Sequence, residues 1–83
     1  MTDRFTIEVE FRGETLHYIE PERRTSMEWY WTNGYSIVAG SIRHWRHADG
    51  AETPVTDDER DEIVRRVIEY ARREQGVKLR VDP

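Results

Sequence analysis

The three histidines, His17, His44 and His47, are the residues best suited to hold a metal ion, and the last two form a His-x-x-His pair. Protein zinc sites use four ligands, or three ligands and a water. Residues three apart on a strand point to opposite faces of the sheet, so His44 and His47 would not share one ion there. The sequence indicates no third ligand, and it contains no cysteine. We therefore expect no metal site and no cofactor.

A group of carboxylates at the start of a predicted helix is the second set of residues that could do chemistry. Asp57, Asp58, Asp61 and Glu62 could bind a cation or form an acid–base pair. Carboxylates in a first helical turn already have a structural role, because they face the positive end of the helix dipole. The serines lie in no Gly-x-Ser-x-Gly elbow, and the glycines form no phosphate-binding motif. We expect a protein that is not an enzyme; an enzyme using these carboxylates is the third-ranked alternative.

Composition narrows the class of protein. The chain has 83 residues, a net charge of −4, and no apolar run that resembles a signal peptide or a membrane span. Its acidic balance disfavours a general nucleic-acid binder. The absence of cysteine is typical of the cytoplasm, and the strong excess of arginine over lysine indicates a bacterial source. We expect one small domain over residues 1–83, located in the cytoplasm.

Aliphatic side chains are scarce in this sequence. Leu, Ile, Val and Phe together number 17 of the 83 residues, close to the roughly 20% below which chains tend to be disordered. Nine aromatic residues, three of them tryptophan, offset this shortage, since each can bury about 150–250 Å². Aromatic residues must therefore supply much of the core.

The first part of the chain predicts a β-hairpin. Residues 4–12 alternate apolar and polar side chains, as in a strand that is buried on one face. Gly13 permits a tight turn, and residues 15–19 form the second strand. A turn at Gly13 and the residue after it places Phe11 opposite Leu16, and a turn one residue earlier keeps the same facing.

The strongest local signal is Asn33-Gly34, which predicts a second hairpin. Asn-Gly between aromatic and β-branched runs is typical of a two-residue type I′ turn, because both central residues need a positive φ. This turn joins strands over residues 27–32 and 35–39 and places Tyr30 opposite Ile37.

The segments around this hairpin are less clearly marked. The fourth strand is predicted to continue through residues 40–46, and a bulge at Gly40-Ser41 would reverse the facing of Arg43 and Trp45. Two polar segments are interpreted as connections, residues 20–25 and residues 47–53.

A helix follows, and both of its ends are marked. Thr56 and Glu59 form the capping box at its start, and Gly76 is the expected residue just beyond its end. Residues 77–81 alternate again and predict a fifth strand. The helix carries one apolar stripe, formed by Ile63, Val64, Val67, Ile68 and Ala71.

The predicted fold is α+β, with the order β-β-β-β-α-β. An antiparallel sheet of four to five strands is covered on one face by the single helix. The helix is expected to pack on the sheet face that bears Phe5, Ile7, Val9, Phe11, Leu16 and Tyr18, completed by Trp29, Trp31 and Val38.

The other face of the sheet is the predicted binding surface. Strand parity places on it a mixture of aromatic, apolar and basic side chains, which are types enriched at interaction surfaces. We therefore expect a binding or regulatory module whose ligand is another protein or a second copy of the chain. A loop or the fifth strand covering this face is the competing interpretation. The predicted contact residues are Tyr30, Tyr35, Ile37, Arg43 and Trp45.

Binding of single-stranded nucleic acid is the second-ranked alternative. The basic and aromatic run from Arg43 to His47 could stack bases and contact phosphates. However, Glu8, Glu10 and Glu28 share the same predicted face and would repel phosphates. A nucleic-acid partner is therefore disfavoured.

Overall fold

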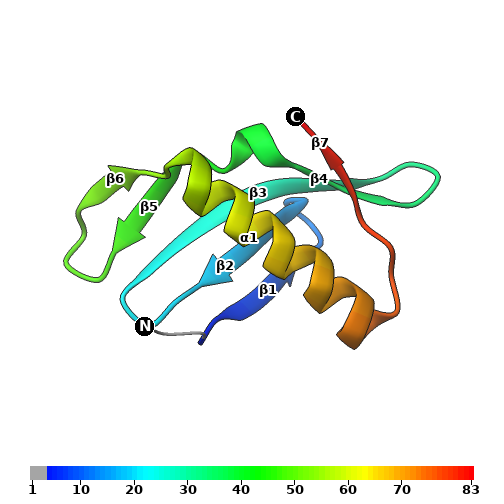
Figure 1. The fold of residues 1–83 in the computed structure, drawn as a ribbon, viewed down its shortest axis with the longest axis horizontal. Coiled ribbons are helices and arrows are strands. Elements are labelled where there is room, and N and C mark those ends of the chain that lie inside the picture. The colour runs from blue at the N-terminus through cyan, green and yellow to red at the C-terminus, as the bar shows by residue number, and fades with distance from the viewer. Residues whose placement is uncertain (1–3) are drawn as a thin grey trace.

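The computed structural model describes residues 4–83, and in it one helix lies across one face of a mostly antiparallel sheet (Figure 1). This arrangement confirms the predicted α+β class and the single helix on one sheet face. The helix is α1 (Asp57–Tyr70), which continues as a wider turn over Ala71–Gln75. The strands are β1 (Thr6–Glu10), β2 (Thr15–Ile19), β3 (Arg23–Trp31), β4 (Tyr35–Val38), β5 (His44–His47), β6 (Glu52–Pro54) and β7 (Arg80–Asp82).

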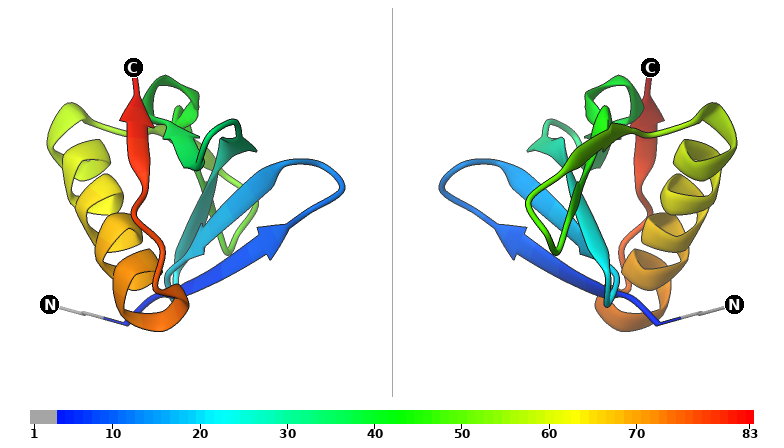
Figure 2. Two further views of the ribbon diagram at one scale, coloured as in Figure 1. Left: turned by 90° about the vertical axis from the view of Figure 1, so that its right-hand side faces the viewer. Right: turned by 90° about the vertical axis from the view of Figure 1, so that its left-hand side faces the viewer.

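The sheet is built on the long strand β3. Its main path runs β1-β2-β3-β4-β7, in which only the β4–β7 pair is parallel. The β5–β6 hairpin pairs with the first two residues of β3. Figure 2 shows the helix and the sheet edge-on as two layers, and the turn of the β1–β2 hairpin points away from the helix.

The register of the first hairpin differs from the prediction by two residues. Val9 lies opposite Leu16, and the turn takes the four residues 11–14 because Glu14, not Gly13, adopts the left-handed conformation, at φ 50°. An even shift preserves which side chains face the helix. It also takes Phe11 out of the strand and into the turn.

The register of the second hairpin differs by one residue, and this reverses the facing of β4. Ile37 lies opposite Trp29 instead of Tyr30, because the loop has three residues, Thr32 to Gly34, instead of two. In a strand an odd shift turns every side chain to the other face. It brings Ile37 into the core, where the aliphatic-poor chain gains a fully buried isoleucine.

Gly34 allows this three-residue loop. Its φ of +119° is open to glycine and strained for any residue with a Cβ. We expect Gly34→Ala to lower the free energy of unfolding by about 1–2 kcal/mol, measured by urea denaturation. Gly13→Ala is the control, because its Cβ would clash only with the end of the flexible Glu10 side chain and would lie at ordinary contact distance from Thr15 Oγ1. Equal stability of the two variants would contradict the strain argument.

The chain between β4 and α1 departs from the predicted continuous strand. β4 ends at Val38, and a helical turn over residues 39–41 redirects the chain. The Ser41 hydroxyl holds this turn, since its Oγ donates to Val38 O at 2.6 Å and accepts from Glu28 N–H at 2.8 Å. After the turn the chain forms β5, and the predicted connections 20–25 and 47–53 prove to contain the start of β3 and part of β6.

The helix boundaries follow the predicted caps. Glu59 N–H donates to Thr56 Oγ1 at 3.2 Å, and Thr56 N–H donates to Glu59 Oε1 at 2.9 Å, so the capping box is confirmed. Gly76 ends the helix at φ 65°. Ile63 and Val67 are the residues of α1 that are buried. The core consists of these two with Ile7, Leu16, Tyr18, Met27, Ile37, Ile42, Trp45 and Val55.

Candidate functional site

Two of the five predicted contact residues lie in the core. Ile37 is 0% exposed and Trp45 is 1% exposed, so their placement on the open face was wrong. Ile37 is buried by the one-residue shift of its hairpin. Trp45 is buried because β5 does not extend β4; it pairs with the start of β3, where Trp45 faces the helix side and its ring packs 6.1 Å from that of Tyr18.

The structure does not bring the other three residues together. Tyr30 lies on the sheet face away from the helix, and its hydroxyl donates to the Asp82 carboxylate. The placement of Tyr35 on the open face was also wrong: the one-residue shift of its hairpin turns it to the helix side, where its ring packs 5.9 Å from that of Trp29. Arg43 is exposed next to β5, and its Nε donates to Gly40 O at 3.2 Å. Contact of these three with a partner stays a prediction.

The open face of the sheet is mostly polar. Glu8, Arg24 and Ser26 lie on this face and are exposed. Among the described residues 4–83, Tyr30 is the only phenylalanine, tryptophan or tyrosine in a strand that points to this face. Stacking of bases needs aromatic platforms. With Trp45 buried, the arrangement that favoured single-stranded nucleic acid is lost.

An apolar groove of about 330 Å³ lies between the end of the helix and the sheet. Val9, Phe11 and Trp31 are predicted to lie under the helix, but this prediction is wrong: Val9 is exposed, Phe11 is 72% exposed and Trp31 is 61% exposed. They lie at the turn ends of the hairpins, beyond the side chains that the helix stripe covers. We call this the apolar groove; it is lined by Ile7, Val9, Phe11, Leu16, Trp29, Tyr35, Ile37, Val67, Tyr70, Ala71, Gln75, Val77 and Leu79.

Aromatic contacts shape the rim of the apolar groove. Phe11 packs edge-on against Trp29, with ring centroids 5.5 Å apart. Trp31 packs edge-on against Tyr35 at 6.2 Å. Such pairs hold aromatic rings in defined orientations. The exposed rings are therefore positioned before any ligand arrives.

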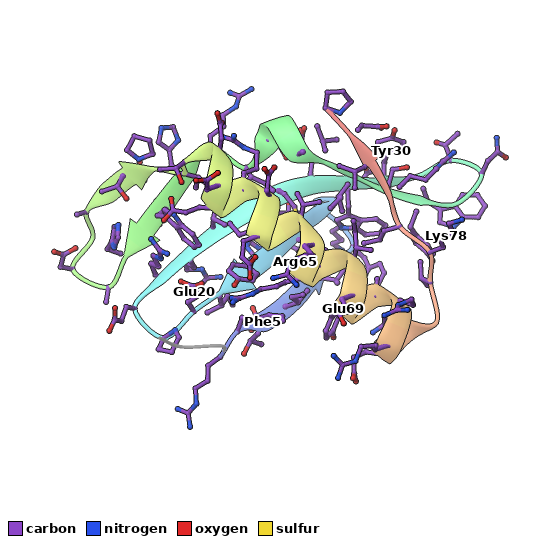
Figure 3. All side chains as sticks on the ribbon, viewed as in Figure 1. Phe5, Glu20, Tyr30, Arg65, Glu69 and Lys78 are labelled. Atoms are coloured by element: carbon purple, nitrogen blue, oxygen red, sulfur yellow. The ribbon has the colours of Figure 1, made fainter. Side chains whose placement is uncertain are left out.

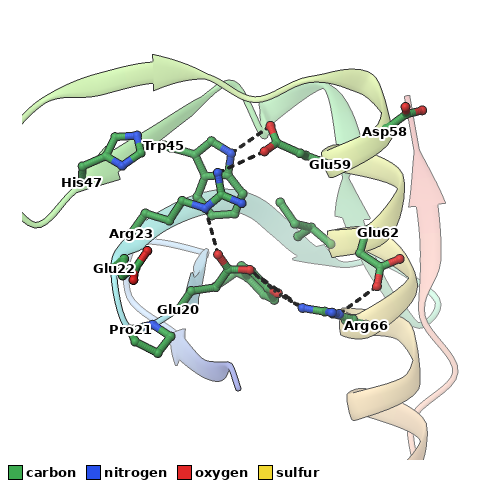
Figure 4. A pocket seen from close by; sticks show the side chains of 12 residues that line it. Glu20, Pro21, Glu22, Arg23, Trp45, His47, Asp58, Glu59, Glu62 and Arg66 are labelled. Carbon is green, nitrogen blue, oxygen red and sulfur yellow. Dashed lines mark hydrogen bonds and ion pairs between the residues drawn. The ribbon is translucent and has the colours of Figure 1, made fainter. Parts of the chain in front are cut away.

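A second hollow, of about 840 Å³, lies at the start of the helix and is lined by charged residues (Figure 4). Arg23 is at its centre. Its Nε donates to Glu20 Oε1 at 2.9 Å, its Nη1 donates to Glu59 Oε2 at 3.0 Å, and its guanidinium stacks 3.8 Å above the Trp45 ring. This side chain links the β2–β3 turn to the first turn of the helix.

Glu59 is the acidic partner in this charged hollow. Burial by itself would raise its pKa, but hydrogen bonds from the Thr56 backbone, Trp45 Nε1 and Arg23 outweigh burial and lower the pKa to about 2. Glu59 is thus ionised at every pH near neutrality. Its oxygens accept hydrogen bonds from the Trp45 indole N–H, the Arg23 guanidinium and the Thr56 backbone N–H. Glu59 therefore has a structural role, holding these three groups in place.

Tyr18 and Arg66 form the other side of the charged hollow. Arg66 Nη1 donates to the Tyr18 hydroxyl at 2.6 Å, which in turn donates to Glu20 Oε2 at 3.1 Å. Burial and the charge of Glu20 raise the pKa of Tyr18 against the opposing effect of Arg66. Neither Tyr18 nor Glu59 changes charge near neutral pH, so neither is tuned for proton transfer there.

The sequence holds one signal for the exposure of Phe11 at the groove: Gly13, which marks the nearby turn. The alternation of residues 4–12 nevertheless predicts Phe11 to be part of the strand. The links of Arg23 to Glu59 and of Tyr18 to Arg66 join residues 36 and 48 positions apart. No local pattern reveals such pairs.

The described residues show no metal site and no membrane-spanning helix, and comparison with known proteins finds no relative. Among residues 4–83 no group of three or more histidine, aspartate or glutamate side chains is placed to hold a metal ion. No helix in the same range is long and apolar enough to cross a membrane. Comparison with family models, with curated proteins and with solved structures finds no match to this chain.

Proposed function

We propose that this protein is a non-enzymatic binding module whose apolar groove takes up an apolar segment of a partner protein. The observation that carries the proposal is the groove itself, with the exposed rings of Phe11 and Trp31 beside it. Contiguous exposed apolar surface on a small domain commonly marks an interaction site. The proposed binding surface is thus on the helix side of the sheet instead of the open face. Of the five predicted contact residues, Tyr35 and the fully buried Ile37 line it.

The scarcity of aliphatic residues strengthens this argument. Complete burial of a side chain such as phenylalanine stabilises a structure by about 1.5–3 kcal/mol. A chain with only 17 Leu, Ile, Val and Phe residues leaves Phe11 largely exposed and Val9 partly exposed. Burial of these side chains on binding would contribute to affinity, as aromatic anchors do at interfaces.

The charges beside the apolar groove indicate the chemistry of the partner. Gln75, Val77 and Leu79 line the groove, and the segment around them carries Arg72, Arg73, Lys78 and Arg80 against Glu69 and Glu74. Glu69 lies 3.9 Å from both Arg72 and Arg73, so the segment keeps a net positive charge; Figure 3 labels Lys78 on it. Such a rim favours an apolar segment flanked by carboxylates. Two copies of the chain meeting here would bring two basic rims together. We therefore propose a different protein as the partner, in preference to a homodimer.

Synthetic peptides test this proposal. The probes are two peptides with the same leucine and phenylalanine anchors, one flanked by Asp and Glu and the other by Lys and Arg. We expect the acidic peptide to bind more tightly, and Phe11→Ser to weaken that binding at least about tenfold, read from tryptophan fluorescence. Val81→Ser is the control, because Val81 is also an apolar side chain with exposed surface but lies outside the groove lining.

Two results would contradict the proposal. One is peptide binding that Phe11→Ser leaves unchanged. The other is a concentration-dependent dimer, detected by light scattering, that Phe11→Ser dissociates, because the occupant would then be a second copy of the chain. A bacterial source and a cytoplasmic location stay expectations from the composition.

A further inference from the structure

A third hollow, of about 570 Å³, lies between β3 and β5, and three of its ten lining residues are arginines. It is distinct from the apolar groove and from the charged hollow at the start of the helix. We call it the basic hollow. It is lined by His17, Arg24, Thr25, Ser26, Ser41, Arg43, His44, Trp45, Arg46 and Glu52.

Two arginines face each other in the basic hollow. The β3–β5 register places Arg24 directly opposite Arg46, and directly opposite side chains in an antiparallel pair lie about 4.5–5.5 Å apart at Cβ. Like charges in this position destabilise the sheet. Arg46 reaches the exposed Glu52 at 3.4 Å, whereas no residue in the described range 4–83 forms an ion pair with Arg24. The repulsion between the two arginines is therefore only weakly offset within the chain.

The backbone adds donors to the same place. β3 pairs with β5 only at Arg23 and Arg24, and with β4 only from Trp29 onward. Residues 25–28 therefore lack a strand neighbour on that side within the described chain. Glu28 N–H points to that side, where Ser41 Oγ accepts it. Backbone N–H directions repeat every two residues in a strand, so Ser26 N–H points into the gap as well.

We propose that the basic hollow binds a phosphate group, either free or as a monoester. The guanidinium groups of Arg24 and Arg46 would contact its oxygens, since arginine matches phosphate in shape and charge. Ser26 supplies a backbone N–H and a hydroxyl as further donors, and Arg43 adds positive charge at the rim. The carboxylates of Glu8, Glu10 and Glu28 do not line the basic hollow; Glu52, the partner of Arg46, is the acidic residue in its lining. A dianion between Arg24 and Arg46 replaces their repulsion with attraction. This inference is independent of the apolar groove and its partner.

Titration of the full chain with inorganic phosphate at low ionic strength tests this site. Backbone amide NMR is expected to show saturable shifts centred on Ser26. Arg24→Gln and Arg46→Gln should each weaken binding at least about tenfold, the loss expected for one charge-assisted contact. Arg65→Gln is the matched control, because it removes the same charge from an exposed arginine outside the basic hollow.

A second titration with a nucleoside monophosphate distinguishes the two sources of the phosphate group. Tighter binding than inorganic phosphate supports a monoester, and equal or weaker binding supports free phosphate. Absence of a saturable shift at Ser26, or equal weakening by Arg65→Gln, would overturn the proposal. Arg24 and Arg46 are both exposed, so their variants should fold. Phosphate should raise the melting temperature of the wild-type chain but not that of the variant that combines Arg24→Gln with Arg46→Gln.

Discussion

Replacement of Ile37 by alanine is expected to lower the free energy of unfolding by about 3–4 kcal/mol. Ile37 has no exposed surface and lies in the core opposite Trp29. Truncation of a fully buried isoleucine removes its transfer free energy and leaves a cavity, with typical losses of 2–5 kcal/mol. In a domain of this size such a loss removes a large part of the total stability. Urea denaturation followed by circular dichroism measures the effect.

The Ile37 variant also tests the register of the second hairpin. With the two-residue turn expected from Asn33-Gly34, Ile37 would lie on the open face, and the substitution would change stability by about 0.5 kcal/mol or less. Val81→Ala is the control, because Val81 lies opposite Ile37 on β7 and is partly exposed. Similar small losses in the two variants would refute the observed register.

Replacement of Glu59 by alanine is expected to lower the free energy of unfolding by about 2–3 kcal/mol. The substitution leaves three donors without their acceptor: Trp45 Nε1–H, Arg23 Nη1 and the Thr56 backbone N–H. A buried or partly buried donor left unpaired costs about 1–3 kcal/mol, and loss of the capping box adds to this. Asp58→Ala is the matched control, because Asp58 belongs to the same helical turn but accepts none of these bonds. A Glu59→Ala variant as stable as Asp58→Ala would contradict this role.

The same carboxylate predicts a specific dependence of stability on pH. The folded protein holds the pKa of Glu59 at about 2, below its ordinary value of 4.5. Because the folded-state pKa is lowered, the stabilisation is complete above about pH 4.5 and is lost as the pH falls towards 2. Solvent screening of a partly exposed group reduces the effect to about 1–2 kcal/mol. Glu59→Gln should flatten the profile between these pH values; an unchanged profile would exclude Glu59 as its source.

The ends of the helix were predictable because their signals are local. Thr56 and Glu59 satisfy backbone donors only three residues apart, and Gly76 takes a conformation that other residues resist. Alternation in residues 4–12 likewise identified β1 and the side of it that faces the helix, although within β1 only Ile7 is buried. These features depend on neighbours in sequence, so they are the same in any fold that keeps the segment.

The predicted lengths of the turns were the main error in the predicted registers. The observed lengths determine which side chains face the apolar groove. The Asn33-Gly34 signal is compatible with loops of two or three residues, and the choice reverses the facing of Tyr35 and Ile37. The three-residue loop buries Ile37 completely. The free energy of that burial, which depends on the helix and on β7, exceeds the local preference for a type I′ turn.

The sequence by itself determined the α+β class, the single amphipathic helix with its caps, and a shortage of aliphatic residues that aromatic residues must offset. Only the tertiary structure decided which aromatic residues do so. Trp45 is buried because β5 pairs with the distant β3, and its indole N–H is accepted by Glu59. Phe11 and Trp31 stay exposed because the helix does not cover the turn ends of the sheet. Facing and exposure depend on contacts between residues far apart in the chain, and periodicity carries no information about those contacts.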